Sequence, residues 1–180
     1  MNTVYNNQSI PYIQTFIFEN ISFIIGILHI NKTSDSMSKS LSKFQDKLTN
    51  KEYENLSSVL LTYRRTEFSQ PQQFEININT WEIRRKIFYC DPQQLSQKLH
   101  VENNHNFITE ILRSGQARRY LTQEKINLMF SYINSTPRKS LENKTPYEIF
   151  TFIYGKELAD KLNIQKIEKD EVCTTPRLLK

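Results

Sequence analysis

The strongest constraint on the fold is the run ISFIIGILHI at residues 21–30, where apolar side chains follow one another without polar alternation. A strand of this kind is covered on both faces, so the run predicts a central strand in a sheet that carries helices on both sides. The run is about half the length of the roughly 20 residues that a membrane-spanning helix needs. No Lys or Arg precedes Lys32, so no secretory signal is expected. We expect a cytoplasmic protein without membrane segments.

Length, cysteine usage and charge limit the number of domains, the metal sites and the binding partners that can be expected. At 180 residues the chain is expected to form one domain rather than two full ones. Cys90 and Cys173 lie far apart, and no histidine stands at zinc-ligand spacing from them, so free thiols and no zinc are expected. Within the formal charge of +5, residues 81–150 hold eleven basic and seven acidic side chains. This local excess fits nucleic acid, although a solvated helical surface gives the same count.

The hydrophobic period changes along the chain from that of strands to that of helices. Thr49 and Glu52 form a capping-box pattern that predicts a short helix after Thr49. The Gln- and Asn-rich residues 69–80 predict a loop. Strands are expected at residues 1–5, 12–18, 21–28, 59–62 and 87–90, with a turn at 19–20 and an amphipathic helix at 35–48. Strands followed by helices indicate an α/β protein with a mixed sheet.

Beyond residue 100 the pattern is helical. Val101, His105 and Ile108 share one helical face, and Ile126, Met129, Phe130 and Ile133 share another. The strongest local signal is the segment TPYE at residues 145–148, which places Thr at the N-cap, Pro at N1 and Glu at N3 of a helix. From Glu168 onward, we expect a loosely attached tail.

Several motifs occur in an order that is typical of one family. They are LTYRRTEF at 61–68, IFYCDP at 87–92, QKLHVE at 97–102 and INSTPRKSLENKTPYEIF at 133–150. This order resembles the DDE transposases of bacterial insertion sequences, in particular the insertion-sequence-thirty group with its retroviral-integrase-like core. The most specific part is the last motif, which is similar to that group's Asn-x-x-Pro-Arg-Lys-x-Leu element followed by Thr-Pro-Tyr-Glu. The resemblance extends over nearly the whole chain.

The resemblance implies an RNase H-like fold, in which a mixed five-stranded sheet is flanked by helices and followed by a helical C-terminal extension. Residues 1–150 would form the integrase-like core and residues 151–180 the extension and tail, with the family's amino-terminal helix-turn-helix domain absent. In the family, three carboxylates from strand one, strand four and a helix hold two divalent metal ions. Such ions flank a phosphodiester and stabilise its entering and leaving oxygens.

Carried onto this chain, the resemblance implies a catalytic site that has lost two of its three acids. The family's helix Glu falls on Glu102, its strand-four Asp on Tyr63 and its strand-one Asp on Asn2. We therefore expect no metal, and Mg²⁺ only if activity survives. Glu102 has a second interpretation as an ordinary helix-surface carboxylate. Replacement of the lost acids by Asp91, Glu67 or Glu19 is an open alternative.

Basic residues in the family motifs are the candidates for DNA contact. Phosphate contacts would give salt-dependent, sequence-independent affinity, whereas the alternative is a solvated loop. The candidates are Lys98, Arg138, Lys139 and Lys144, with weaker clusters at Arg84, Arg85 and Lys86 and at Arg118 and Arg119.

These observations leave three hypotheses. The first is a degenerate, inactive transposase core with weak residual DNA binding, nucleoid-associated when bound and forming oligomers with itself or with an intact transposase. The second is an active metal-dependent DDE transposase that performs strand transfer. The third is a translated pseudogene fragment without a role. Loss of the carboxylates favours the first and third over the second.

Overall fold

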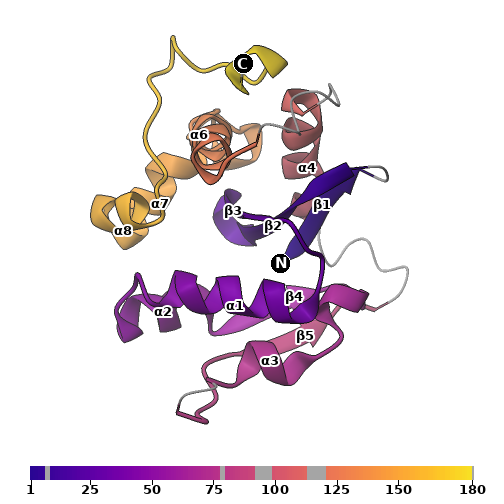
Figure 1. Ribbon diagram of the computed structural model, residues 1–180. Helices are drawn as coiled ribbons and strands as arrows, with labels where there is room; N and C mark the ends of the chain where they lie inside the picture. Colours follow the sequence, from indigo (N-terminus) through magenta and orange to yellow (C-terminus); the bar gives the residue numbers. More distant parts are fainter. Residues whose placement is uncertain (7–8, 78–79, 92–98, 113–120, 180) are drawn as a thin grey trace.

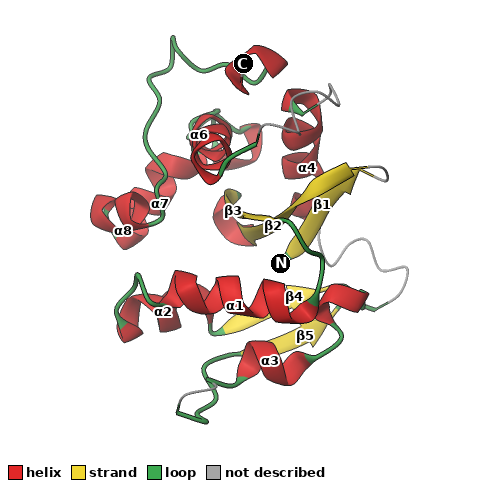
Figure 2. Ribbon diagram, viewed as in Figure 1, coloured by secondary structure: helices red, strands yellow, loops and turns green. Residues whose placement is uncertain are grey.

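The chain combines two small sheets with helices packed around them (Figure 1). The computed structural model describes residues 1–6, 9–77, 80–91, 99–112 and 121–179, and for residues 5–6, 9–10 and 99–104 only the backbone. In the view of Figure 2, helices lie above and below the upper group of three strands, and a further helix lies below the lower pair. None of the helices in the described part of the chain has the length and apolar character needed to cross a bilayer.

The first sheet is an antiparallel meander of three strands. β1 (Asn2–Asn6) pairs with β2 (Ser9–Phe18), and β2 pairs with β3 (Phe23–His29) through the 3₁₀ turn η1 (Glu19–Ile21). The three strands are confirmed within one to three residues of their predicted bounds. The order is β1-β2-β3. The expectation that residues 21–28 form a central strand is therefore wrong, because β3 lies at an edge of this sheet.

Helix α6 (Gln123–Asn134) explains how an edge strand can be apolar on both faces. The Asn134 side-chain amide accepts from Ile24 N at 2.9 Å and donates to Ile24 O at 2.8 Å. Three turns earlier, Gln123 donates to Gly26 O at 2.9 Å and accepts from Leu28 N at 2.8 Å. These amides occupy the place of a neighbouring strand, so the edge is satisfied without one.

The second sheet is a parallel pair, β4 (Val59–Thr62) with β5 (Lys86–Tyr89). β4 matches its predicted bounds, and β5 lies one residue earlier than predicted. Backbone hydrogen bonds define one sheet of three strands and one of two strands. They do not define the single five-stranded sheet that the resemblance implies. Between β4 and β5 lies helix α3 (Pro71–Glu75), where a loop was predicted. Pro71 begins that helix and Phe74 is fully buried, which stabilises a turn that composition alone does not indicate.

Two helices connect the sheets. In α1 (Ser34–Gln45), Thr33 caps the amino terminus, and Met37 and Leu41 are buried. α2 (Asn50–Ser57) begins with the predicted capping box, both of whose hydrogen bonds are present. The segment between β3 and β4 therefore consists mainly of two helices whose amino termini are both capped.

The carboxyl-terminal helices cover the other face of the first sheet. α7 (Pro146–Tyr154) begins with the predicted capping box at Thr145, and Phe150 stacks on Phe23 of β3 at 3.9 Å between ring centroids. α8 (Lys156–Lys161) returns toward α2, where Lys161 Nζ lies 2.7 Å from Glu52 Oε1. Hydrogen bonds from Lys161 and from the cap lower the pKa of Glu52 to about 2.

The final residues are attached more firmly than predicted. The 3₁₀ turn η5 (Pro176–Leu179) buries Leu179, whose carbonyl accepts from Lys125 Nζ of α6 at 2.9 Å. The expectation of a loose tail is therefore wrong at this end, because an apolar side chain close to the terminus reaches the core.

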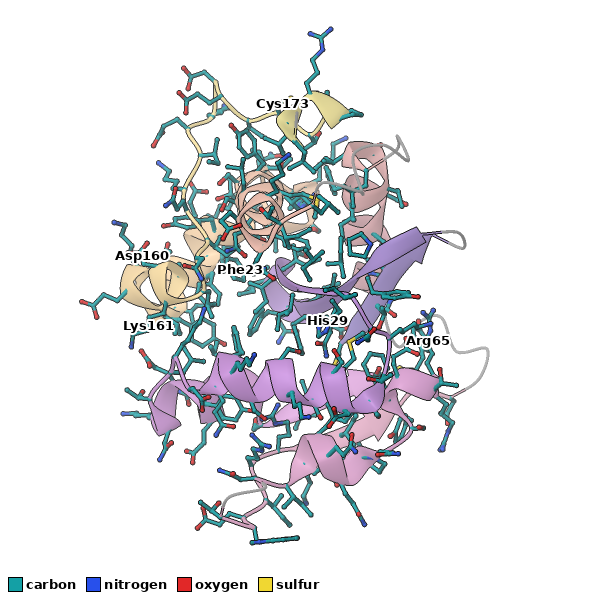
Figure 3. The ribbon with its side chains drawn as sticks, in the orientation of Figure 1. Phe23, His29, Arg65, Asp160, Lys161 and Cys173 are labelled. Atoms are coloured by element: carbon teal, nitrogen blue, oxygen red, sulfur yellow. The ribbon has the colours of Figure 1, made fainter. Side chains whose placement is uncertain are left out.

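A buried polar network joins the first sheet to α1 (Figure 3). His29 is buried; its Nε2 lies 3.0 Å from Gln14 Oε1 and 3.2 Å from Ser40 Oγ, and its Nδ1 lies 3.1 Å from Ser36 Oγ. Gln14 in turn contacts Met1 Sδ at 3.2 Å. Because no carboxylate is part of this network, burial lowers the pKa of His29 from 6.5 to about 4.

This network predicts a loss of stability in mild acid. Below pH 6.5 the unfolded chain takes up a proton on His29, whereas the folded chain resists it until about pH 4. The free energy of unfolding should therefore fall by about 2 kcal/mol between pH 7.5 and pH 5, as measured by urea denaturation. The His29→Gln variant should lose this contribution to the pH dependence. An equal pH dependence in both proteins would contradict the role of His29.

Candidate nucleic-acid interface

The start of β1 lies against the end of β4, which brings Asn2 and Tyr63, two of the positions predicted from the resemblance, into one region. The Met1 ammonium donates to Leu61 O at 2.7 Å, so Asn2 follows directly after a residue bonded to β4. Asn2 is buried, and its Oδ1 accepts from Thr3 N at 2.8 Å. Tyr63 is half-buried just beyond the end of β4. These two positions supply an amide and a phenol.

Two arginines follow Tyr63 at the same strand end. Arg64 is exposed, and its guanidinium lies 5.1 Å from the ring centroid of Tyr89, the last residue of β5. Arg65 lies 5.9 Å from the ring of Tyr63, and its Nη1 approaches Thr3 O at 3.5 Å (Figure 3). Cation–π contacts orient both guanidinium groups. Each group carries five N–H donors, of which Arg65 directs one at Thr3 O, so other donors remain for an anion.

Glu67 is an acid that this strand end uses internally. It lies in the 3₁₀ turn η2 (Thr66–Phe68), is fully buried, and its Oε1 lies 3.5 Å from Lys32 Nζ. Ser34 Oγ, in the first turn of α1, donates to Glu67 O at 3.1 Å. This pairing holds η2 against the start of α1, so Glu67 acts as a packing element here.

The remaining carboxylate candidates come from separate elements. Glu19 is half-buried in η1, and Asp91 is exposed after β5. Glu102 lies in helix α4 (Leu99–Ile111), but its side chain is outside the described residues, as is all of Lys98. Within the described part of the chain, no three His, Cys, Asp or Glu side chains come together as metal ligands would.

The motif at residues 133–141 divides into inward and outward side chains. Asn134 closes the edge of β3, as described above. Arg138 also turns inward: its guanidinium stacks over the Phe107 ring at 4.0 Å and Nη2 donates to Ile133 O at 3.1 Å. Burial lowers the pKa of Arg138 to about 10. This arginine therefore joins α4 to the loop after α6, a structural role beside its predicted contact with DNA.

Lys139 and Lys144, by contrast, are exposed in the loop between α6 and α7. Lys139 begins the 3₁₀ turn η4 (Lys139–Leu141), and Lys144 directly precedes Thr145, the N-cap of α7. Of the weaker clusters, Arg84 donates to Gln45 Oε1 at 2.8 Å, and Arg85 is buried over the Tyr53 ring at 4.6 Å. Burial lowers the pKa of Arg85 to about 9. The pair at 118–119 lies outside the described residues.

Arg64 and Arg65 were not among the DNA contacts predicted from the sequence. The signal was present, because two adjacent arginines follow an aromatic residue at the predicted end of a strand. An aromatic and basic strand end is a common arrangement for binding nucleic-acid backbones.

Comparison with known proteins adds one line of evidence. A stretch of 64 residues is 34% identical to the transposases InsI for the insertion sequence elements IS30A and IS30C of Escherichia coli strain K12. The similarity is to insertion-sequence transposases. The stretch is 36% of this chain and 17% of each transposase, so the match spans less than a fifth of those relatives. No protein-family model matches the chain.

Proposed function

We propose that this chain is an RNase H-like core of insertion-sequence transposase ancestry that binds the DNA backbone and does not cut it. The local similarity to the InsI transposases supports the ancestry. The bond from the Met1 ammonium to Leu61 O supports a strand order β3-β2-β1-β4-β5, with the parallel pair continuing the meander. In such a fold, ligands meet the sheet where parallel strands end.

The side chains at this strand end are poorly suited to divalent metal ions. Mg²⁺ prefers carboxylate oxygens in octahedral geometry. Asn2 offers an amide oxygen that already accepts a hydrogen bond from Thr3 N, and Tyr63 offers a phenol. The guanidinium groups of Arg64 and Arg65 would repel a cation. The proposal therefore includes no metal-dependent step.

The single observation that carries the proposal is the arginine pair at the end of β4. Arg64 and Arg65 lie against the rings of Tyr89 and Tyr63, and among the described residues neither guanidinium forms an ion pair with an acid. Phosphate oxygens are the anions that a guanidinium fork binds most readily. The DNA backbone presents phosphates at regular spacing whatever the base sequence. Binding through them would therefore be weak, salt-dependent and independent of sequence.

The test is DNA binding by fluorescence anisotropy at two salt concentrations. The double variant Arg64→Ala, Arg65→Ala should bind a labelled duplex about tenfold more weakly at low salt, and its salt dependence should fall by about two phosphate contacts. Lys51 and Lys169 are exposed on other elements, so a Lys51→Ala, Lys169→Ala variant of equal charge is the matched control. Chelation of divalent ions should leave the affinity unchanged.

Two results would contradict the proposal. If the arginine variant and the lysine control lose affinity equally, binding is a general effect of positive charge and the strand end has no special role. If the chain nicks supercoiled DNA with Mg²⁺ or Mn²⁺ and Glu102→Ala abolishes this, the protein is an active transposase core.

A further inference from the structure

The last turn of α7 carries an apolar side chain that nothing in the described chain covers. Phe152 is 91% exposed, more than any other large apolar side chain in the described residues, and its neighbour Ile153 is 53% exposed. The opposite face of α7 is committed to the core, because Tyr147 and Phe150 are buried. The last turn of α7 therefore presents two adjacent apolar side chains to solvent.

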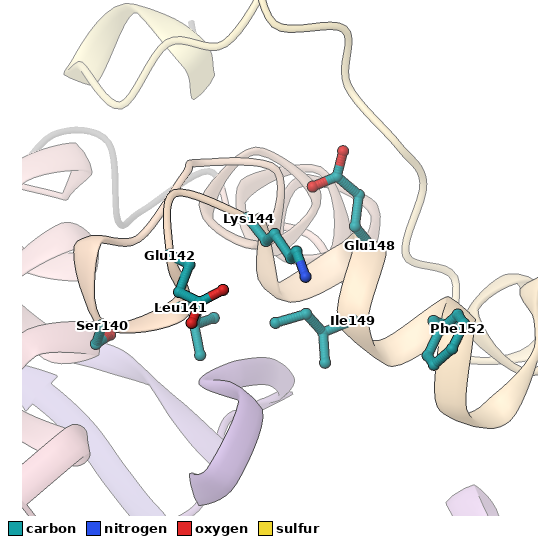
Figure 4. Close-up of a pocket in the computed structure, with 7 residues that line it drawn as sticks. All are labelled: Ser140, Leu141, Glu142, Lys144, Glu148, Ile149 and Phe152. Carbon is teal, nitrogen blue, oxygen red and sulfur yellow. The ribbon is translucent and has the colours of Figure 1, made fainter.

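Beside Phe152 lies a hollow of about 640 Å³ between α7 and the loop that precedes it (Figure 4). Leu141, Ile149 and Phe152 contribute its apolar lining, and Glu142, Lys144 and Glu148 its polar rim. The volume exceeds the ~150 Å³ in which a dry cavity can bind benzene. A phenyl side chain from outside therefore has room to enter.

The wall of this hollow is preformed. Glu142 and Asn143 both adopt the left-handed conformation, with φ of 55° and 62°. Asn143 N donates to Arg138 O at 2.9 Å, and Lys144 N donates to Leu141 O at 3.0 Å. Two successive left-handed residues are costly and persist only where the surroundings hold them, a pattern that clusters at ligand-binding positions.

We propose that this surface binds the same surface of a second copy of the chain. A projecting ring and a hollow that accepts a ring lie on one patch, so a two-fold axis between two copies places each Phe152 in its partner's hollow. The rim is also self-complementary in charge. Lys144 carries the opposite sign to Glu142 and Glu148, so two-fold pairing brings each lysine toward carboxylates of the other copy.

The size of the patch sets the expected strength. A stable interface buries about 800 Å² on each partner. One helix turn, a loop and a hollow amount to less than this, so we expect a reversible dimer in the micromolar range. The association needs no DNA, and it is independent of the strand-end site proposed above.

The experiment is sedimentation velocity of the full chain without DNA, across about 5 to 200 µM protein, a range that brackets micromolar affinity. The wild type should shift from monomer to dimer as concentration rises. Phe152→Glu should remain monomeric throughout, with an unchanged melting temperature because the side chain is exposed. Ile83 is 72% exposed on another segment, so Ile83→Glu is the matched control and should dimerise like the wild type.

A charge exchange tests the orientation. Lys144→Glu should weaken the dimer at least tenfold, and adding Glu142→Lys should restore it. A wild-type chain that stays monomeric at every concentration overturns the proposal and leaves a different protein as the occupant of the hollow. Dimerisation that survives Phe152→Glu, or that Ile83→Glu abolishes, places the interface elsewhere and overturns it as well.

Discussion

Replacing Asn134 by leucine is expected to lower the free energy of unfolding by about 4 kcal/mol. The side chain is fully buried and makes both hydrogen bonds to Ile24 of β3. Leucine fills a similar volume but leaves a buried backbone N–H and C=O without partners, each worth about 1–3 kcal/mol. This is a large part of the roughly 5–15 kcal/mol that a domain has in total. Urea denaturation at neutral pH measures the difference.

Asn127 provides the control for this prediction. It lies on α6 two turns before Asn134, is half-buried, and accepts a hydrogen bond from Gln123 Nε2 at 2.8 Å. Asn127→Leu should cost less than about 1 kcal/mol, because water can replace the lost contact. Equal losses in the two variants would show that the amide closure of β3 contributes no more than an ordinary surface contact.

Replacing Gly26 by alanine is expected to cost about 3 kcal/mol, for a reason of space. A Cβ at this position would overlap the ring of Phe130, with Cζ at 2.8 Å, and would lie 3.1 Å from Ile13 Cγ2. Phe130 is fully buried in the centre of α6, and side chains in a close-packed core have little room to turn. Overpacking of this kind typically costs about 1–3 kcal/mol. Because two buried side chains, Phe130 and Ile13, would both have to shift, we place this case at the upper end.

The cause can be checked with a double-mutant cycle. Phe130→Leu alone should destabilise the chain by leaving a cavity, but in the Gly26→Ala background it also makes room for the new methyl group. The double variant should therefore be more stable than the sum of the single effects predicts, by about 1–2 kcal/mol. Additive losses would mean that the two residues do not compete for the same space.

Local signals in the sequence predicted much of the fold. The capping boxes at Thr49 and Thr145 and the strand at residues 59–62 follow from residues within a few positions of one another. The helix α3 and the docked Leu179 were missed, because each depends on one apolar side chain whose burial is decided by distant elements. The polar composition of these segments is as stated, but the inference from it that they do not pack against the core was wrong.

The position of β3 could not be predicted from its own residues. The run at 21–30 indicates a strand buried on both faces, and that much is confirmed for residues 23–26. The run does not reveal whether another strand or a helix lies beside the edge of β3. The groups that close the edge are the amides of Gln123 and Asn134, which lie about a hundred positions away and look like ordinary polar residues of an amphipathic helix. A family motif containing Asn134 was recognised, but for its DNA contacts.

At the candidate site, Asn2 and Tyr63 were proposed from the resemblance alone. The bond from Met1 N to Leu61 O brings the start of β1 to the end of β4. The orientation of charged side chains did not follow. Arg138 stacks on Phe107 from another helix, whereas Arg64 projects from a strand end, and nothing in either local sequence distinguishes the two. Such orientations depend on which aromatic ring the tertiary structure places nearby.

The amide closure of β3 also restricts how molecules of this kind can assemble. An open sheet edge invites a foreign strand, and that is a common route to uncontrolled polymerisation. Here the outward-facing groups of Ile24, Gly26 and Leu28 are already engaged by helix α6. Recruitment of another copy at this edge would first have to displace a helix from the core, so strand-to-strand assembly through β3 is blocked.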